Sequence, residues 1–158
     1  MAQTGAQDDA SRLVETYSPM LLRLACTRLE NPADAEDAVQ EVFLKLLTVR
    51  PAFRDAEHQK AWLIRATLHR AADLRKAAAR RNVPLEALLA LAPEPENQLL
   101  AAVRALPEKY SAVIHLHYYE GYSLKEIGKL LGLPAATVGT RLARGRERLR
   151  QSLKEEIE

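Results

Sequence analysis

Two helix patterns separated by a three-residue turn occupy the last third of the chain and limit its possible folds more than any other feature. Ser123 and Glu126 form the S-x-x-E pair of a capping box, which starts a helix. Gly132 favours a tight corner, and Pro134 fits only near the start of the next helix, over 135–153. The pattern predicts a helix-turn-helix, a motif that places its second helix in the major groove of DNA.

The second of these helices divides into two faces when its residues are placed at about 100° per residue. Leucines and Val138 form an apolar face, which predicts burial. Threonines and arginines share the outward face, and its N-terminal end is the part that would enter the groove. The predicted base and phosphate contacts on this face are Thr137, Thr140, Arg141, Arg144 and Arg148.

A second basic helix is predicted over 60–81, where Leu63 and Ile64 mark the core side. The opposite stripe combines cations for phosphates, an aromatic ring for stacking and polar groups that can read base edges, a mixture that suits unpaired or opening DNA. An ordinary solvated face with Trp62 partly in the core is the alternative interpretation of this stripe. Its members are Trp62, Arg65, His69, Asp73, Lys76 and Arg80.

Charge is unevenly distributed over the 158 residues, although the net charge is only +2. Residues 30–44 contain five acids and no base, whereas residues 62–81 contain six bases and one acid. Residues 139–150 contain five arginines and one glutamate. Two basic patches and one acidic patch indicate two phosphate-facing surfaces and one surface for a basic protein partner.

The rest of the chain also reads as helical, with no alternation long enough for a strand. We expect a first helix over 11–29, then one that Asn31 caps and Pro51 ends, with Leu47 on its apolar side. Residues 52–59 read as a loop, and helices follow at 98–106 and 107–120. The prediction is an all-α fold of two small helical domains, 10–81 and 97–158, joined by a proline-rich linker over 82–96.

Several other classes of protein are disfavoured. Cys26 is the only cysteine, so no internal disulfide can form. No apolar run approaches the ~20 residues that span a bilayer, and no signal pattern is present, so we expect a cytoplasmic protein without membrane insertion. An enzyme is the weaker alternative, because His115 and His117 are two residues apart and point to different faces of a helix. No metal, cofactor or catalytic residue is expected.

Two motif sets in order resemble a known family. The run Asp34 to Phe43 (DAEDAVQEVF), then Phe53-Arg54, then Trp62 to Arg65 (WLIR), is similar to region two of bacterial sigma factors. The segments LPEKY at 106–110, EGYS at 120–123 and RLARGR at 141–146 resemble region four. Only these two regions are recognisable, which is the layout of the extracytoplasmic-function (ECF) group.

The resemblance implies a transcription initiation factor that binds core RNA polymerase and directs it to promoter DNA. Region two would recognise and melt the −10 element with Phe53 and the stripe that begins at Trp62, and region four would hold the −35 element as duplex. The resemblance also implies an anti-sigma protein as a partner. Docking on the polymerase clamp helices would fall to the acidic helix, through Asp34, Asp37, Gln40, Glu41 and Leu44.

Two positions depart from the family pattern. His69 stands where asparagine is common, and imidazole lacks the paired donor and acceptor of an amide, so base preference there should differ. Gly139 stands where a basic residue is usual, which removes a contact and costs the helix about 1 kcal/mol relative to Ala. We therefore predict weak −35 binding by the C-terminal half alone. A stand-alone helix-turn-helix repressor or activator is the other function kept open.

Overall fold

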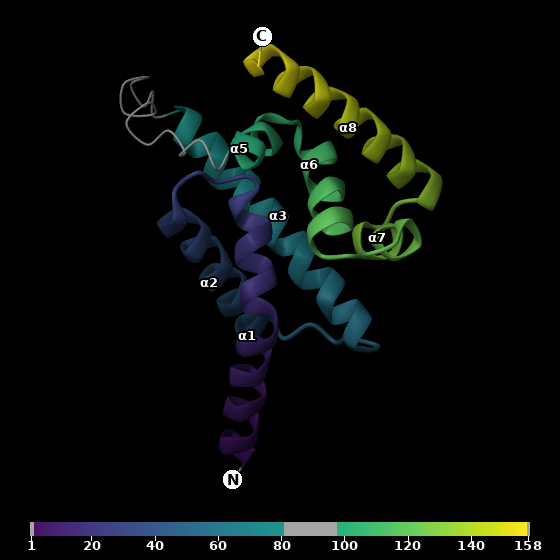
Figure 1. Cartoon of the computed structure of the whole chain (residues 1–158). Coiled ribbons are helices and arrows are strands. Elements are labelled where there is room, and N and C mark those ends of the chain that lie inside the picture. The colour runs from purple at the N-terminus through teal and green to yellow at the C-terminus, as the bar shows by residue number, and fades with distance from the viewer. Residues whose placement is uncertain (1, 81–97, 158) are drawn as a thin grey trace.

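The computed structural model describes residues 2–80 and 98–157, and within these ranges every regular element is a helix. The predicted all-α fold is confirmed. The predicted linker over 82–96 lies outside the described residues. Figure 1 shows three N-terminal helices in one group, with the C-terminal helices packed along one side of it.

The N-terminal unit consists of three helices that pack against one another, namely α1 (Ala2–Cys26), α2 (Pro32–Val49) and α3 (Ala56–Arg80). Asn31 caps α2 as predicted, because its Oδ1 accepts a hydrogen bond of 2.9 Å from Ala33 N. The helix ends at Val49, and its C-cap Arg50, one residue before Pro51, has a left-handed φ of 49°.

Two boundaries in this unit differ from the prediction. The first helix begins at Ala2 rather than near residue 11, and its N-terminal half projects beyond the other helices in Figure 1. The third helix begins at Ala56 rather than at Lys60. Asp55 explains that earlier start, because its Oδ1 accepts a hydrogen bond of 2.8 Å from His58 N at the first turn.

The C-terminal unit contains a π-helical turn that the sequence pattern did not predict. The expected helix over 107–120 is divided into an α-helix and a wider turn that ends where Glu120 N donates to His115 O at 3.1 Å. The elements of this unit are α5 (Gln98–Ala105), α6 (Glu108–Ile114), η2 (His115–Tyr119), α7 (Leu124–Leu131) and α8 (Ala135–Ile157).

The helix-turn-helix is confirmed in its local geometry. Ser123 Oγ accepts from Glu126 N at 3.1 Å, and Glu126 Oε1 accepts from Ser123 N at 3.1 Å, which completes the capping box. Gly132 has the left-handed φ of 72° that a tight corner needs. Gly128 is required for a different reason, because a Cβ there would lie 2.5 Å from the carbonyl oxygen of Leu133.

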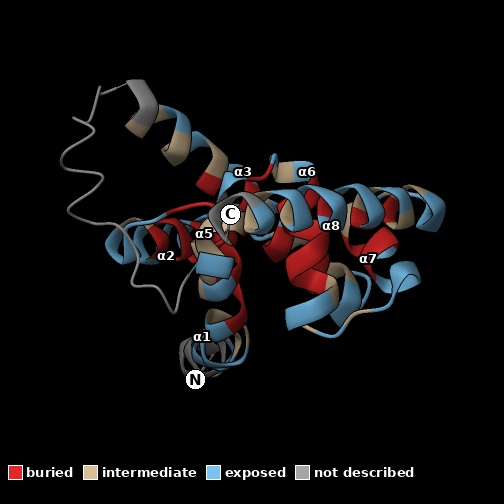
Figure 2. Cartoon of the chain, turned by 45° about the horizontal axis from the view of Figure 1, so that its top comes forward, coloured by how far each residue is buried: buried red, intermediate tan, exposed pale blue. Residues whose placement is uncertain are grey.

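One apolar core runs through both units. Leu63 and Ile64 of α3 are buried in the same cluster as Leu116, Ile127 and Val138 of the C-terminal unit. Figure 2 shows the buried residues on the sides of the helices that face one another. None of the helices in residues 2–80 and 98–157 combines the length and the apolar character that crossing a bilayer requires.

Candidate nucleic-acid interface

The recognition helix α8 presents its predicted DNA face to solvent. Val138 and Leu142 are buried and fix the helix on the core, as the apolar pattern predicted. On the other side Thr140, Arg144 and Arg148 are exposed, whereas Thr137 and Arg141 are half-buried. All five predicted contacts of this helix therefore lie on one accessible surface.

A basic hollow of about 380 Å³ lies beside this surface, between α6 and α8. Lys109 and Tyr110 line it from α6, together with four of the predicted DNA contacts of α8. The Tyr110 ring lies under Arg148, whose guanidinium carbon is 5.0 Å from the ring centroid. Gly145 permits the close approach of the two helices, since a Cβ there would be 3.2 Å from Tyr110 Cβ.

Sequence reasoning missed Lys109 and Tyr110 because they belong to α6, which is separated from the recognition helix by η2 and α7. The only available signal was their place beside Pro107 in the segment that resembles region four. The packing of α6 against α8 brings both residues to the DNA face.

The stripe of α3 is only partly free. His69, Asp73 and Lys76 are exposed, and the side chain of Arg80 lies outside the described residues. Trp62 is half-buried and packs against the core, so the alternative that placed its ring partly in the core describes it correctly.

An aromatic cluster stands at the start of α3. Phe53, from the loop before the helix, meets Trp62 edge-on with ring centroids 6.1 Å apart. His58 also meets Phe53 edge-on, at 5.4 Å, and its Nδ1 accepts from Arg54 N at 3.2 Å. The loop and the helix thus present one continuous aromatic surface, to which His58 is an addition that the sequence did not indicate.

His69 and Asp73 also line a hollow of about 210 Å³ between α2 and α3. Arg70 forms an ion pair with Glu41 of α2 at this hollow, and that hydrogen bond raises the pKa of Arg70 above its usual value. Glu41, which the resemblance assigned to polymerase docking, is therefore already paired with Arg70 in this structure.

Arg65 is exposed but is hydrogen-bonded to the C-terminal unit. Its Nε donates to Leu130 O at 2.8 Å, and its Nη2 donates to Lys129 O at 3.2 Å. Both carbonyls belong to the last turn of α7, where backbone acceptors lack partners within the helix. The predicted −10 residue Arg65 is therefore occupied by the helix-turn-helix.

The outer face of α2 combines acids with exposed apolar side chains. Asp37 and Gln40 are exposed, and Asp34 is half-buried in the first turn. Leu44 is 62% exposed, and Leu47, which was predicted to lie on the apolar side of the helix, is 50% exposed. Leu47 lies next to the buried stripe of α2 on the helix surface, and the last buried residue of that stripe is Leu46. Exposed leucines beside acids are typical of a protein-docking surface.

The two histidines considered for a metal site have different surroundings. His115 is buried and stacks on Tyr119, whereas His117 Nδ1 donates to Tyr122 O at 2.8 Å. No group of three or more metal-ligating side chains occurs in the described parts of the chain.

Comparison with known proteins covers both units. Residues 13–81 match the family "Sigma-70 region 2", and residues 96–149 match "Sigma-70, region 4". The ECF RNA polymerase sigma factor SigW of Bacillus subtilis is 30% identical over 96% of this chain and 92% of its own length. RNA polymerase sigma factor SigV of the same species is 33% identical over 85% of this chain and 84% of its own length.

Solved structures show the same fold. CnrH, in complex with the cytosolic domain of CnrY, gives a TM-score of 0.71 at 24% identity over 96% of this chain and 92% of that one. Sigma factor RpoE from Bartonella quintana, in complex with the anti-sigma factor NepR, gives a TM-score of 0.67 at 20% identity over 92% of this chain and 97% of that one. This chain therefore belongs to the sigma-70 family, in its ECF group of RNA polymerase sigma factors.

Proposed function

We infer that this chain is a transcription initiation factor that binds core RNA polymerase and directs it to promoters. The observation that carries the inference is the pairing of two sigma-70 regions, in order, with two separate basic helices and one acidic, leucine-bearing helix. A stand-alone repressor would use α8 but would give no role to the surfaces of α2 and α3.

The −35 element is the proposed duplex target of α8. Phosphate contacts by arginines supply affinity and a steep salt dependence, and base contacts supply promoter choice. Thr140 and Arg141, near the start of the helix, are the proposed base readers. Arg144 and Arg148, with Lys109 of α6, would follow the phosphates, and the exposure of all three side chains supports this role.

The −10 element is the proposed target of the loop before α3 and of α3 itself. Phe53 and Trp62 offer ring faces and edges on which an unstacked base can lie. His69 and Asp73 border a hollow in which polar groups surround a small space, as a pocket for one extruded base requires. Lys76 and Arg80 would hold the backbone on either side, and Arg65 would join them once it releases the α7 carbonyls of Leu130 and Lys129.

Core polymerase is the proposed partner of α2. Charge and hydrogen-bond acceptors come from Asp34, Asp37 and Gln40, and Leu44 offers apolar contact. Glu41 would leave its ion pair with Arg70 and form one with a cationic side chain of the polymerase. We place the boundaries of the polymerase-binding and −35-binding domains at 10–81 and 97–158. The proposed factor has no enzymatic turnover, works in the cytoplasm, and opens DNA with binding free energy alone.

An anti-sigma protein is a further proposed partner. CnrH and RpoE were each solved with a second protein bound, and RpoE with one named as an anti-sigma factor. In this chain the boundary between the two units forms an apolar hollow of about 280 Å³, lined by Leu22, Leu99 and Tyr119 among others. A partner that covered this boundary would hold both DNA-binding surfaces at once.

Run-off transcription with purified core polymerase on genomic fragments tests the function. Core polymerase with this chain should initiate at a discrete set of new sites that core polymerase alone does not use. A matched variant with Asp37→Lys and Leu44→Ser should lose this activity while the free chain keeps its thermal stability, since both side chains are exposed. A stable dimer that binds a palindrome and adds no initiation site would instead identify a repressor.

A further inference from the structure

The loop that carries Phe53 into α3 is held at its end by one side chain. Arg54 N donates a hydrogen bond of 3.2 Å to Nδ1 of His58, in the first turn of the helix. Within residues 2–80 and 98–157, no other hydrogen bond engages the backbone of residues 51–54. The path of the chain from Pro51 to α3 therefore depends on this contact and on the packing of the Phe53 ring.

The contact completes a capping box in which histidine takes the place of the usual glutamate. Asp55 Oδ1 accepts from His58 N at 2.8 Å, as an N-cap side chain accepts from the third helical residue. In the usual box the side chain of that third residue reaches back to the backbone N–H of the N-cap. Here His58 reaches back one residue further, to Arg54, and therefore ties the loop as well as the helix end.

The ring of His58 also supports the aromatic cluster of the proposed −10 surface. It meets Phe53 edge-on at 5.4 Å with an interplanar angle of 90°, and Phe53 meets Trp62 at 6.1 Å. All three rings are half-buried. Because the hydrogen bond fixes Arg54, the neighbour of Phe53, one side chain controls both the backbone beside Phe53 and one contact of its ring.

The hydrogen bond requires one protonation state of His58. A backbone N–H can only donate, so Nδ1 has to be unprotonated, with the proton of the neutral ring on Nε2. A second proton, at Nδ1, turns the acceptor into a donor that faces the N–H of Arg54. Histidine is the side chain that ordinarily gains a proton between pH 8 and 5. We therefore expect the loop to be released when His58 becomes protonated.

The other charged groups around this segment are all exposed to solvent. Those of the loop and the first turn of α3 are Arg54, Asp55 and Glu57, and those of α1 are Asp9 and Arg12, which line a hollow together with Gln59. Solvent and salt weaken their fields at the ring. A substitution of His58 leaves all of them in place, so it isolates the contribution of the imidazole.

We propose that His58 is a positioning residue for −10 recognition: its unprotonated Nδ1 holds the loop so that Phe53 is presented to an unstacked base, and its protonation releases the loop. The proposal rests on the −10 role inferred above for Phe53 and Trp62. Only chains with the loop in place bind the base, so the measured dissociation constant is the intrinsic one divided by the fraction held. Binding of −10 DNA is therefore weaker in acid, by the factor that this fraction falls.

Trp62 is the only tryptophan of the chain, so its fluorescence reports the loop without a label. The measurement is the quenching of Trp62 by acrylamide at pH 7.5 and 6.0 in the parent chain, His58→Asn and His58→Phe. Asparagine places an acceptor oxygen where the imidazole has Nδ1 and does not titrate, whereas phenylalanine keeps a ring without an acceptor. Quenching should be low at both pH values in His58→Asn, high at both in His58→Phe, and should rise with acid only in the parent chain. Glu57→Gln, a change at an exposed position of the same turn, should match the parent chain.

Fluorescence anisotropy with a single-stranded −10 oligonucleotide, taken from a promoter that the run-off assay identifies, measures the effect on binding. The complex of core polymerase with the full chain is used. His58→Phe should bind about fivefold more weakly than the parent chain at pH 7.5, the equilibrium factor that one capping hydrogen bond ordinarily contributes. Between pH 7.5 and 6.0 the affinity of the parent chain should fall about threefold relative to that of His58→Asn.

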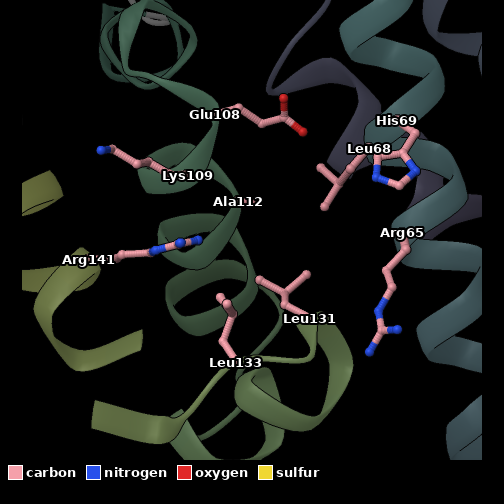
Figure 3. Close-up of a pocket in the computed structure, with 9 residues that line it drawn as sticks. All are labelled: Arg65, Leu68, His69, Glu108, Lys109, Ala112, Leu131, Leu133 and Arg141. Atoms are coloured by element: carbon pink, nitrogen blue, oxygen red, sulfur yellow. The ribbon is translucent and has the colours of Figure 1, made fainter. Parts of the chain in front are cut away.

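The comparison with His58→Asn removes the effect of the other histidines. His69 is exposed at the proposed −10 pocket, and Figure 3 shows its ring at the wall of a second hollow, one turn along α3 from Arg65. Protonation of His69 would also change DNA binding, but equally in the parent chain and in His58→Asn. Melting curves at both pH values check that every variant is folded.

The outcomes separate this proposal from the function on which it rests. Equal quenching in His58→Phe and the parent chain at pH 7.5, or an equal rise with acid in His58→Asn and the parent chain, overturns the role of His58 even if the chain supports transcription. Quenching that responds as expected while −10 affinity is the same in every variant also overturns the positioning role. A chain that adds no initiation site overturns the promoter function, and the quenching experiment then still decides whether His58 holds the loop.

Discussion

The two basic helices differ in how ready they are to bind DNA. The outward face of α8 is accessible along its first three turns, where the exposed Arg144 and the half-buried Arg141 border a hollow. On α3, Arg65 is bonded to α7 and Arg70 to Glu41 of α2. The difference indicates that the proposed duplex-binding surface of α8 is preformed, whereas part of the proposed −10 surface of α3 is engaged by Arg65 in contacts within the chain.

The largest predicted effect breaks the preformed surface. Gly128→Val should destabilise the C-terminal unit by about 2–3 kcal/mol and abolish −35 binding, because the added Cβ would collide with the carbonyl of Leu133. Urea unfolding and anisotropy with −35 duplex measure the two effects. Gly139→Ala is the matched control, since its Cβ meets only Leu124 Cδ1 at an ordinary 3.8 Å. Equal stability of the two variants would contradict the packing described for the turn.

The next prediction distinguishes base contacts from phosphate contacts on α8. Arg141→Ala should cost about 1–3 kcal/mol of discrimination between cognate and altered −35 sequences. Arg148→Ala should weaken binding to all sequences alike and reduce the slope of log K against log salt by about 1. Titrations on four duplexes at three salt concentrations measure both. An equal loss of affinity for all four duplexes in Arg141→Ala would show that Arg141 contacts a phosphate and not a base.

Acid should weaken the boundary between the units. Burial holds the pKa of His115 below its usual 6.5, and the hydrogen bond from Arg23 holds the pKa of Glu120 below its usual 4.5. The unfolded chain therefore binds more protons than the folded chain below about pH 6.5, so the free energy of unfolding falls as pH drops. The contribution of His115 is lost first, and that of Glu120 follows at lower pH.

Urea unfolding at pH 7.5, 6.5 and 5.5 measures this trend. His115→Gln should flatten the dependence over that range, because it removes the buried imidazole. The same slope in His115→Gln as in the parent chain would show that another group carries the pH dependence.

The smallest predicted effect is a gain in the DNA affinity of α8. Gly139→Lys should raise −35 affinity several-fold, because lysine adds a phosphate contact and recovers about 1 kcal/mol of helix propensity. A Cβ at this position would meet Leu124 Cδ1 at an ordinary contact distance of 3.8 Å, so a side chain can be added there without a clash at Cβ. Anisotropy in parallel with Gly139→Ala separates the charge from the propensity, and equal affinities of the two variants would remove Gly139 from the DNA face.

Local signals explain what the sequence could predict. The capping box of Ser123, the left-handed Gly132 and the cap of Asn31 depend on neighbours within a few residues, and all three formed as predicted. The apolar stripe of α8 depends only on helical period, and Val138 and Leu142 are buried as it requires.

What the sequence did not predict depends on contacts between distant segments. The engagement of Arg65 by α7 joins two positions that are 65 residues apart in the chain. Lys109 reaches the DNA face only because α6 packs on α8. The exposure of Leu47 follows from a helix angle too close to the edge of the stripe for periodicity to decide.

Chemical footprinting of the polymerase complex on one of its promoters tests most directly whether this chain contacts both promoter elements. We predict two protected segments, at −35 and −10, in the same complex, with permanganate-reactive thymines only at −10, and the loss of this reactivity in a Trp62→Ala variant. Protection at −35 alone, with fully paired DNA downstream, would contradict the claim that one chain both binds the −35 duplex and helps to open the −10 strands.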